Sequence, residues 1–213
     1  VALVCIIFLM HVRSALVAVI LCGTAWPAVA QRVLSDWKPG ASPEPIGQPI
    51  DGMFQAAFAT VGENVFIGGQ PTERALRELR AKGVTTIVNL RMPEEMARIG
   101  FDEAALAKEL GMRYVHIPMN GSAANPYGPK QLDAFAAAMS SADGKVLLHC
   151  TVAWRASHMW AAYLIRERNI PVQTALEQTR KINLRDDQPF NNVQPLEGLL
   201  GRAVPEMAHP APK

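Results

Sequence analysis

The chain has 213 residues, of which 49% are apolar and 19% are charged, and its formal net charge is +2. This composition is that of an ordinary globular domain, and it excludes collagen-like, coiled-coil and intrinsically disordered classes. The near balance of basic and acidic side chains provides no clustered positive face, so we expect neither nucleic-acid binding nor a polybasic membrane patch.

The first 30 residues differ sharply from the rest, because they contain 24 apolar residues, one Arg and no acidic residue. From Met10 a short basic start precedes an apolar core, residues 15–22, and the small residues Ala28-Val29-Ala30. This order predicts a secretory signal peptide, residues 1–30, cleaved after Ala30. Residues 1–9 are then an over-extended start or, alternatively, the first half of an uncleaved anchor. A cleaved leader places the protein in the periplasm or outside the cell, with no stable membrane insertion.

Removal of the leader leaves Cys150 as the sole thiol, because Cys5 and Cys22 lie within it. An intramolecular disulfide is then excluded, and a lone thiol in an oxidising compartment is inert, linked to another molecule, or reactive. The histidines of the mature chain are scattered and show no metal-ligand spacing with Cys150. We therefore expect no metal site and no organic cofactor.

The mature chain begins with a Pro-containing lead-in, residues 31–53, and then alternates between strand-like and helical patterns. β-branched apolar runs predict the strands, and helical spacing with caps such as Asp102 predicts the helices. The expected strands are residues 65–67, 84–90, 112–117 and 145–149, and the expected helices are residues 71–82, a region from 93, 103–110, 130–139, 155–168 and 171–181. Residues 183–213 are expected to form a polar C-terminal tail.

Strands that alternate with helices in this way predict right-handed crossover connections and one α/β domain, residues 54–182. Its sheet is expected to be mostly parallel, to have four or five strands, and to be flanked by helices. Ligands in such sheets bind beyond the C-terminal ends of the strands, so the residues that follow each strand are the candidate site residues.

The segment after the last expected strand carries the strongest chemical signal. Cys150 ends this strand and Arg155 begins the next helix, and the residues between them are Thr151, Val152, Ala153 and Trp154. A loop of this kind directs backbone N–H groups inward, and the helix N-terminus and the Arg155 fork add positive charge, which suits a tetrahedral oxyanion. The same field favours a Cys150 thiolate that can attack phosphorus. The alternative is an inert buried cysteine with a surface arginine nearby.

These residues resemble the cysteine-dependent tyrosine and dual-specificity phosphatase superfamily, in particular the bacterial beta-lactamase-hydrolase-like phosphatase type. The resemblance covers residues 54–181, and its landmarks, in order, are Phe66-Ile67-Gly68-Gly69-Gln70-Pro71-Thr72, Thr86-Ile87-Val88-Asn89-Leu90-Arg91, Tyr114-Val115-His116-Ile117-Pro118, and His149-Cys150 followed by Arg155. It implies a dual-specificity-phosphatase-like fold. It also implies that Cys150 is the nucleophile, that Arg155 binds phosphate, and that His149 orients the loop and tunes the thiol. The implied substrate is a phosphorylated protein with phosphotyrosine-like groups or a small phosphoester.

Two departures from the superfamily pattern keep alternative functions open. Four residues separate Cys150 from Arg155, a spacing that also occurs in rhodanese-type sulfurtransferases, whose cysteine carries a persulfide. Asn120 lies where the superfamily has its general acid, and an amide cannot protonate a leaving group; Asp133 is an alternative acid. The alternatives are therefore a sulfurtransferase that uses a Cys150 persulfide and a catalytically impaired, anion-binding pseudophosphatase.

Three further residues have two interpretations each. Ala153 replaces the Gly that is usual in the subgroup, and a positive φ there costs alanine roughly 1 kcal/mol. Trp154 forms a wall of the substrate pocket, or its ring packs on a neighbouring loop. Arg91 contacts a second anionic group of the substrate, or it is a surface arginine paired with Glu94 or Glu95.

Overall fold

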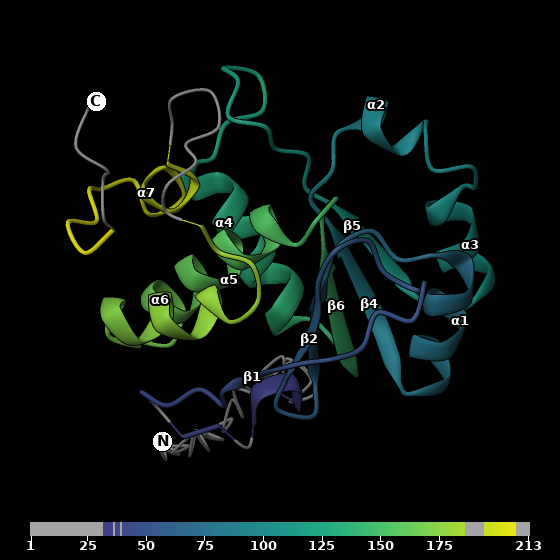
Figure 1. The fold of residues 1–213 in the computed structure, drawn as a ribbon, viewed down its shortest axis with the longest axis horizontal. Helices are drawn as coiled ribbons and strands as arrows, with labels where there is room; N and C mark the ends of the chain where they lie inside the picture. The colour runs from purple at the N-terminus through teal and green to yellow at the C-terminus, as the bar shows by residue number, and fades with distance from the viewer. Residues whose placement is uncertain (1–31, 36, 39, 186–193, 208–213) are drawn as a thin grey trace, which may run out of the picture.

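The computed structural model describes residues 32–35, 37–38, 40–185 and 194–207 (Figure 1). The expected signal peptide, residues 1–30, and its cleavage after Ala30 lie outside the described residues. Within the described ranges, no helix combines the length and the apolar character that crossing a membrane requires.

A single mixed sheet forms the centre of the described residues, and its strands follow the order β1-β2-β3-β6-β4-β5. The strands are β1 (Pro45–Gly47), β2 (Phe58–Val61), β3 (Val65–Gly68), β4 (Val84–Asn89), β5 (Arg113–His116) and β6 (Lys145–His149). Strands β3, β6, β4 and β5 are mutually parallel, whereas β1 and β2 add an antiparallel edge. The predicted α/β fold with a mostly parallel sheet is confirmed. The predicted number of strands is too low, because the sheet of the described residues has six.

Helices cover both faces of the sheet, as Figure 1 shows. One face carries α1 (Glu73–Ala81) and α3 (Glu103–Glu109), and the other carries α4 (Pro129–Ser140), α5 (Trp154–Glu167), α6 (Val172–Arg180) and α7 (Pro195–Leu200). The short helices η1 (Arg32–Leu34) and α2 (Pro93–Met96) complete the described elements. Two separate apolar cores result, one under α1 and α3 and a larger one around α5, so the sheet is buried on both sides.

Side-chain caps fix the starts of α1 and α3, and Asp102 is the cap that the sequence predicts for α3. The Thr72 hydroxyl accepts a hydrogen bond from the Ala75 N–H at 3.2 Å, and the Asp102 carboxylate accepts one from the Ala105 N–H at 2.9 Å. Side-chain caps satisfy N–H groups that the first helical turn leaves without partners. The segments before α1 and α3 therefore have fixed positions, and both contribute residues to the site.

The expectation of a polar C-terminal tail is wrong for the described part of residues 183–213. Helix α7 packs against α4 and α5, and Leu196 and Leu199 are fully buried. A Cβ added at Gly198 would lie 2.3 Å from the Tyr127 carbonyl oxygen, so the backbone of α7 approaches that loop closely. One helical turn with two buried leucines is too short to produce a clear periodic signal in the sequence.

The expected lead-in also belongs to the folded body. Strand β1 lies within residues 31–53, and Val33 is 3% exposed. The Trp37 ring meets the Trp160 ring edge-on, with centroids 6.0 Å apart. The N-terminal segment therefore seals the larger core beside α5.

Candidate active site

The loop between β6 and α5 forms one wall of a cavity of about 660 Å³. Cys150 follows β6 directly and lines this cavity although the residue is only 1% exposed. The residues that line it are Met92, Glu94, Glu95, Asn120, Tyr127, Cys150, Thr151, Val152, Trp154 and Arg155. Of the predicted site residues, the structure therefore brings Cys150, Arg155, Thr151, Val152 and Trp154 to one cavity.

Close backbone packing holds this loop against the strand β3 side of the sheet. The Gln70 N–H donates to the Thr151 carbonyl at 2.9 Å, and Gly69 pairs with Val152 in an antiparallel bridge. A Cβ added at Gly69 would lie 1.7 Å from the Gln55 carbonyl oxygen, so only glycine fits there. The glycines of the Phe66–Thr72 landmark thus permit the approach that fixes the loop.

Ala153 has a positive φ, the strained conformation that was considered for it because the subgroup usually has Gly at this position. Its φ is 65° and its ψ is −2°, and it is the N-cap of α5. Both the N–H and the hydroxyl of Ser157 donate to the Ala153 carbonyl at 2.8 Å, which holds the turn in place. The fully buried Ala153 lies behind the cavity wall rather than in it, and its left-handed backbone costs about 1 kcal/mol relative to glycine.

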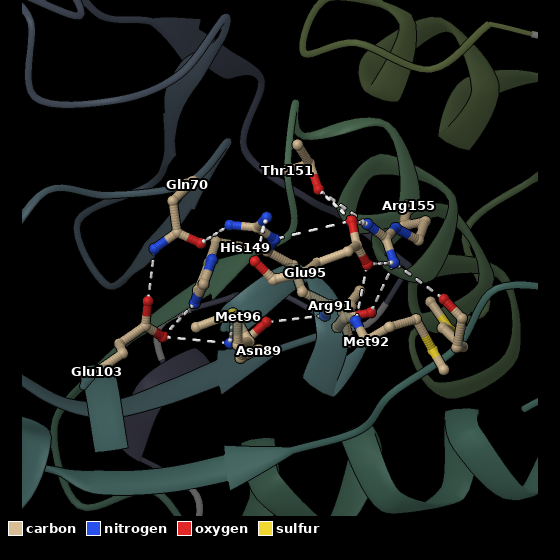
Figure 2. Close-up of polar contacts among 12 residues, drawn as sticks. Gln70, Asn89, Arg91, Met92, Glu95, Met96, Glu103, His149, Thr151 and Arg155 are labelled. Atoms are coloured by element: carbon tan, nitrogen blue, oxygen red, sulfur yellow. Dashed lines mark hydrogen bonds and ion pairs between the residues drawn. The ribbon is translucent and has the colours of Figure 1, made fainter. Parts of the chain in front are cut away.

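The Arg155 guanidinium is held on two sides (Figure 2). On one side Nη1 donates to the Leu90 carbonyl at 3.1 Å and to the Met119 carbonyl at 3.0 Å. On the other side the Glu95 carboxylate forms a bidentate pair, with Nη1 to Oε2 at 2.8 Å and Nη2 to Oε1 at 2.7 Å. These contacts order the fork at the cavity, because a bidentate pair fixes both distance and plane.

Glu95 is a site residue that the sequence interpretation treated only as a surface partner of Arg91. Its carboxylate also accepts the Thr151 hydroxyl at 2.6 Å and the Met92 N–H at 2.7 Å. Burial alone would raise the pKa of Glu95, but the hydrogen bonds from Arg155, Met92 and Thr151 outweigh it and lower the pKa to about 2. Glu95 is therefore ionised at neutral pH and cannot act as a proton donor there.

A second carboxylate, that of Glu103, lies behind the loop and is sealed from solvent. Its Oε1 is 2.8 Å from His149 Nε2, and the two side chains are 1% and 0% exposed. Gln70 Nε2 donates to Oε2 at 2.6 Å, and Asn89 Nδ2 donates to Oε1 at 3.3 Å. Burial opposes ionisation of Glu103, but His149 and Gln70 together lower its pKa below the usual range. His149 is thereby anchored at the residue that precedes Cys150.

Gln70 and Arg91 connect these two carboxylates, as Figure 2 shows. Arg91 Nη1 donates to Gln70 Oε1 at 2.6 Å, and Nη2 donates to the Glu95 carbonyl at 3.1 Å. Its Nε lies 3.8 Å from Glu95 Oε1. Arg91 is only 6% exposed, so the interpretation as a surface arginine is wrong, although its pairing with Glu95 is present. Burial lowers the pKa of Arg91, while Glu95 opposes that shift.

Trp154 fits both of its predicted descriptions. It lines the cavity, and its ring meets that of Tyr127 edge-on with centroids 6.5 Å apart. Tyr127 lies on the loop before α4, and burial raises its pKa to about 12. Both rings therefore add apolar surface to the wall of the cavity that Arg155 and Glu95 also line.

The two predicted positions for a general acid differ in location. Asn120 lines the cavity, where its Oδ1 accepts the Ser122 N–H at 3.0 Å. Asp133 lies outside the cavity on α4, where it forms an ion pair with Arg166 at 2.9 Å and is 66% exposed. The suggestion of Asp133 as the acid is therefore wrong. Among the described residues, the carboxylates that line the cavity are Glu94 and Glu95.

The sequence reasoning missed Glu95, Glu103 and Gln70 for a common reason. The two glutamates have sufficient local explanations, since Glu95 stands in the first turn after Pro93 and Glu103 follows the cap Asp102. Acidic residues are favoured there by the helix dipole alone. Only the Gln70 position within the Phe66–Thr72 landmark signalled a role beyond local structure. No group of three metal-ligating side chains occurs in the described parts of the chain.

Comparison with known proteins places this geometry among phosphatases. Residues 54–193 match the family model described as DSP-PTPase phosphatase fused to NAD+ Kinase. A beta-lactamase hydrolase-like protein of Xylella fastidiosa (strain Temecula1) is 31% identical over 103 residues, which are 47% of this chain and 23% of the relative. This chain thus matches less than a quarter of the length of that relative.

Solved structures agree in fold. A protein described as a DUF442 phosphatase, from Shewanella putrefaciens CN-32, is 27% identical with a TM-score of 0.53, over 72% of this chain and 95% of its own. PTPMT1 is 22% identical with a TM-score of 0.51, over 65% of this chain and 88% of its own, and it has also been solved in complex with PI(5)P. The dual-specificity-phosphatase-like fold and the superfamily resemblance are confirmed.

Proposed function

Because the chain belongs to the DSP-PTPase phosphatase family, whose model covers residues 54–193, we propose that it hydrolyses phosphomonoesters through a phosphocysteine on Cys150. One observation carries this proposal: Cys150 and the ordered fork of Arg155 line the same cavity at the C-terminal end of β6. That edge of a parallel sheet is where ligands bind in α/β folds.

In the first step the Cys150 thiolate attacks the phosphorus of the bound ester. An S–P bond forms, the P–O bond to the leaving group breaks, and that oxygen departs with the electron pair. The Arg155 guanidinium and the N-terminal end of α5 stabilise the negative charge on the other phosphoryl oxygens. In the second step a water oxygen attacks phosphorus, the S–P bond breaks, and inorganic phosphate and the thiolate are released.

The leaving group determines how fast the first step proceeds. Glu95 is ionised and Asn120 is an amide, so neither supplies a proton to the departing oxygen. Glu94 also lines the cavity, but it is exposed and its side chain forms no hydrogen bond with the described loop between Cys150 and Arg155, so we propose that it does not act as the acid. General acid catalysis typically contributes 10²–10⁴-fold, so substrates with poor leaving groups lose about that factor. Aryl phosphates, including phosphotyrosine-like groups, are therefore the favoured class over alkyl phosphates. A steep fall of kcat with rising leaving-group pKa is the expected signature.

Glu95 acts in this proposal as a positioning residue. Its carboxylate holds Nη1 and Nη2 of Arg155 from the side of α2, while the Leu90 and Met119 carbonyls hold Nη1 from the opposite side. Nη2 also donates to the Thr151 hydroxyl at 3.0 Å, and we propose that a phosphate group in the loop binds the edge formed by Nε and Nη2 and replaces this contact. We further propose that the protein acts in the periplasm or outside the cell, on the basis of the predicted leader.

Hydrolysis of an aryl phosphate by the purified protein tests the proposal. We expect turnover by the wild type, none by Cys150→Ser, and a fall of about 10²–10³-fold in kcat/KM for Arg155→Lys, which loses the bidentate fork. Arg166→Lys, on the same helix but outside the cavity, is the matched control. Equal rates for the wild type and Cys150→Ser, or no turnover at all, would exclude the proposal.

The same protein distinguishes the sulfurtransferase alternative, which the four-residue spacing favours. Incubation with thiosulfate followed by mass spectrometry would reveal one added sulfur on Cys150 if a persulfide forms. We expect no such adduct in a protein that turns over aryl phosphate.

A further inference from the structure

A second cavity, of about 630 Å³, lies beside the one that contains Cys150. It is bounded by the loop before α1, the N-terminal end of α1, Arg91 in the loop after β4, and the segment after α2. Its lining residues are Gly52, Phe54, Gln55, Gln70, Pro71, Thr72, Glu73, Arg74, Arg91, Arg98, Ile99, Gly100 and Phe101. None of these residues has a role in the reaction described above, apart from the contacts of Gln70 and Arg91 with the carboxylate network.

Positive charge dominates this second cavity. Three guanidinium groups, those of Arg74, Arg91 and Arg98, line it, and Glu73 is the one carboxylate among its lining residues. The Arg98 side chain is exposed, and its guanidinium forms no hydrogen bond or ion pair with any residue that the structure describes. Arg74 pairs with Glu78 at 2.8 Å, but both side chains are exposed, so this pair exchanges easily for a stronger partner.

The two cavities share a thin wall. Gln70 and Arg91 line the second cavity, and their direct partners Thr151 and Glu95 line the first. The Gln70 N–H donates to the Thr151 carbonyl at 2.9 Å, and Arg91 Nε lies 3.8 Å from Glu95 Oε1 (Figure 2). The two cavities are therefore adjacent, and Gln70 and Arg91 with their partners Thr151 and Glu95 separate them.

We infer that the second cavity is a subsite for another phosphate group of the same substrate. The inference rests on the proposed function and narrows its substrate class to phosphomonoesters that carry a second phosphate. Arginine forks match phosphate oxygens bidentately, and an unpartnered exposed Arg98 can turn toward such a group at little cost. Phe54, Ile99 and Phe101 add apolar surface for the organic part that links the two phosphates.

The test measures binding, so that it does not depend on turnover. The Cys150→Ser variant is titrated calorimetrically with monophosphates of propanediol, butanediol and hexanediol, and with the corresponding bisphosphates. A molecule with two equivalent phosphates gains about twofold on statistical grounds alone. We expect at least one bisphosphate to bind about fivefold tighter than its monophosphate, or more, because the second phosphate meets the arginine cluster.

Substitutions of the arginines test which of them produce the tighter binding of the bisphosphate. Adding Arg98→Gln should reduce the ratio of the two affinities toward the statistical value, and Arg74→Gln should reduce it less. Lys108→Gln is the matched control, because it removes an exposed positive charge of α3 that does not line the cavity, and it should leave the ratio unchanged.

The outcomes separate this inference from the proposed function. A ratio near twofold at every chain length, or a larger ratio that Arg98→Gln and Arg74→Gln leave intact, would overturn the second subsite. Turnover of aryl phosphate by the wild type would still support the phosphatase in that case. A bisphosphate preference that depends on Arg98, in a protein without turnover, would retain the subsite and reject the reaction.

Discussion

Glu103 and Glu95 each pair with a basic side chain of the segment 149–155, but they do so in opposite surroundings. The Glu103 and His149 side chains are 1% and 0% exposed, and amide groups of Gln70 and Asn89 complete the shell around the carboxylate. The Glu95 and Arg155 side chains are 27% and 11% exposed and line the cavity. One pair therefore lies behind the loop, and the other lines the cavity that we propose binds the substrate.

This difference assigns different roles to the two pairs. When one partner of a sealed pair is removed, the other remains buried without a hydrogen-bond partner and cannot turn to water instead. A pair at a cavity can exchange its partner for water or for a ligand. We therefore expect Glu103 to affect mainly the stability of the fold and Glu95 to affect mainly the reaction.

Truncation of the sealed carboxylate gives the largest expected effect. Glu103→Ala removes the partner of His149, Gln70 and Asn89 together, and should lower the free energy of unfolding by about 3–5 kcal/mol. Urea denaturation followed by circular dichroism measures this loss. Glu109→Ala, on the same helix with an exposed pair to Arg77, should cost about 1 kcal/mol or less. Similar losses for the two variants would contradict the distinction.

Substitution of Glu95, the carboxylate at the cavity, should lower the rate of the proposed reaction. Glu95→Gln keeps the size of the side chain but loses the charged bidentate pair, so we expect kcat/KM to fall by roughly 10- to 100-fold through misplacement of Arg155. Glu167→Gln, on α5 outside the cavity, is the control. In an Arg155→Lys background the same substitution should cost much less, because the fork that it positions is already absent. Additive losses would show that Glu95 does not act through Arg155.

The contribution of Glu95 to the free energy of unfolding should depend on pH in the acidic range. The pKa of Glu95 is about 2 in the folded protein and lies below its ordinary value of 4.5, so its contribution to stability is present above about pH 4.5 and is lost as the pH falls toward 2. This shift corresponds to at most about 3 kcal/mol. The free energy of unfolding of Glu95→Gln should therefore fall less steeply than that of the wild type between pH 4.5 and 2. Parallel curves would refute this assignment.

Substitution of Ala153 by glycine should have the smallest effect on stability. Ala56 has a similar backbone conformation and serves as the comparison. Ala153 and the exposed Ala56 have similar positive φ values, 65° and 67°. Ala56→Gly should stabilise by about 0.5–1 kcal/mol, because only strain is removed. Ala153→Gly also loses a buried methyl group worth about 0.8 kcal/mol, so its net effect should be near zero. Thermal denaturation of both variants measures the difference.

The sequence predicted the helices and strands whose limits a local pattern of apolar residues marks. Strand β6 has the expected limits, and α5 begins one residue before the expected start at Arg155. Strands β1 and β2 were missed because they have only three and four residues, and β1 is defined by its antiparallel pairing with β2 rather than by a local sequence pattern. Glu95 and Glu103 were missed for a related reason: each satisfies a local rule at a helix start, and its second function depends on residues about 46 to 60 positions away.

Direct observation of the reaction intermediate tests the central claim most directly. The wild-type protein is mixed with an aryl phosphate, quenched rapidly with denaturant at neutral pH, digested at neutral pH and analysed by mass spectrometry. We predict that the peptide containing Cys150 gains the mass of one phosphoryl group, and that Cys150→Ser shows neither this adduct nor turnover. Turnover with no phosphoryl group on Cys150 at any quench time, or an adduct on another residue, would contradict the assignment of Cys150 as the nucleophile.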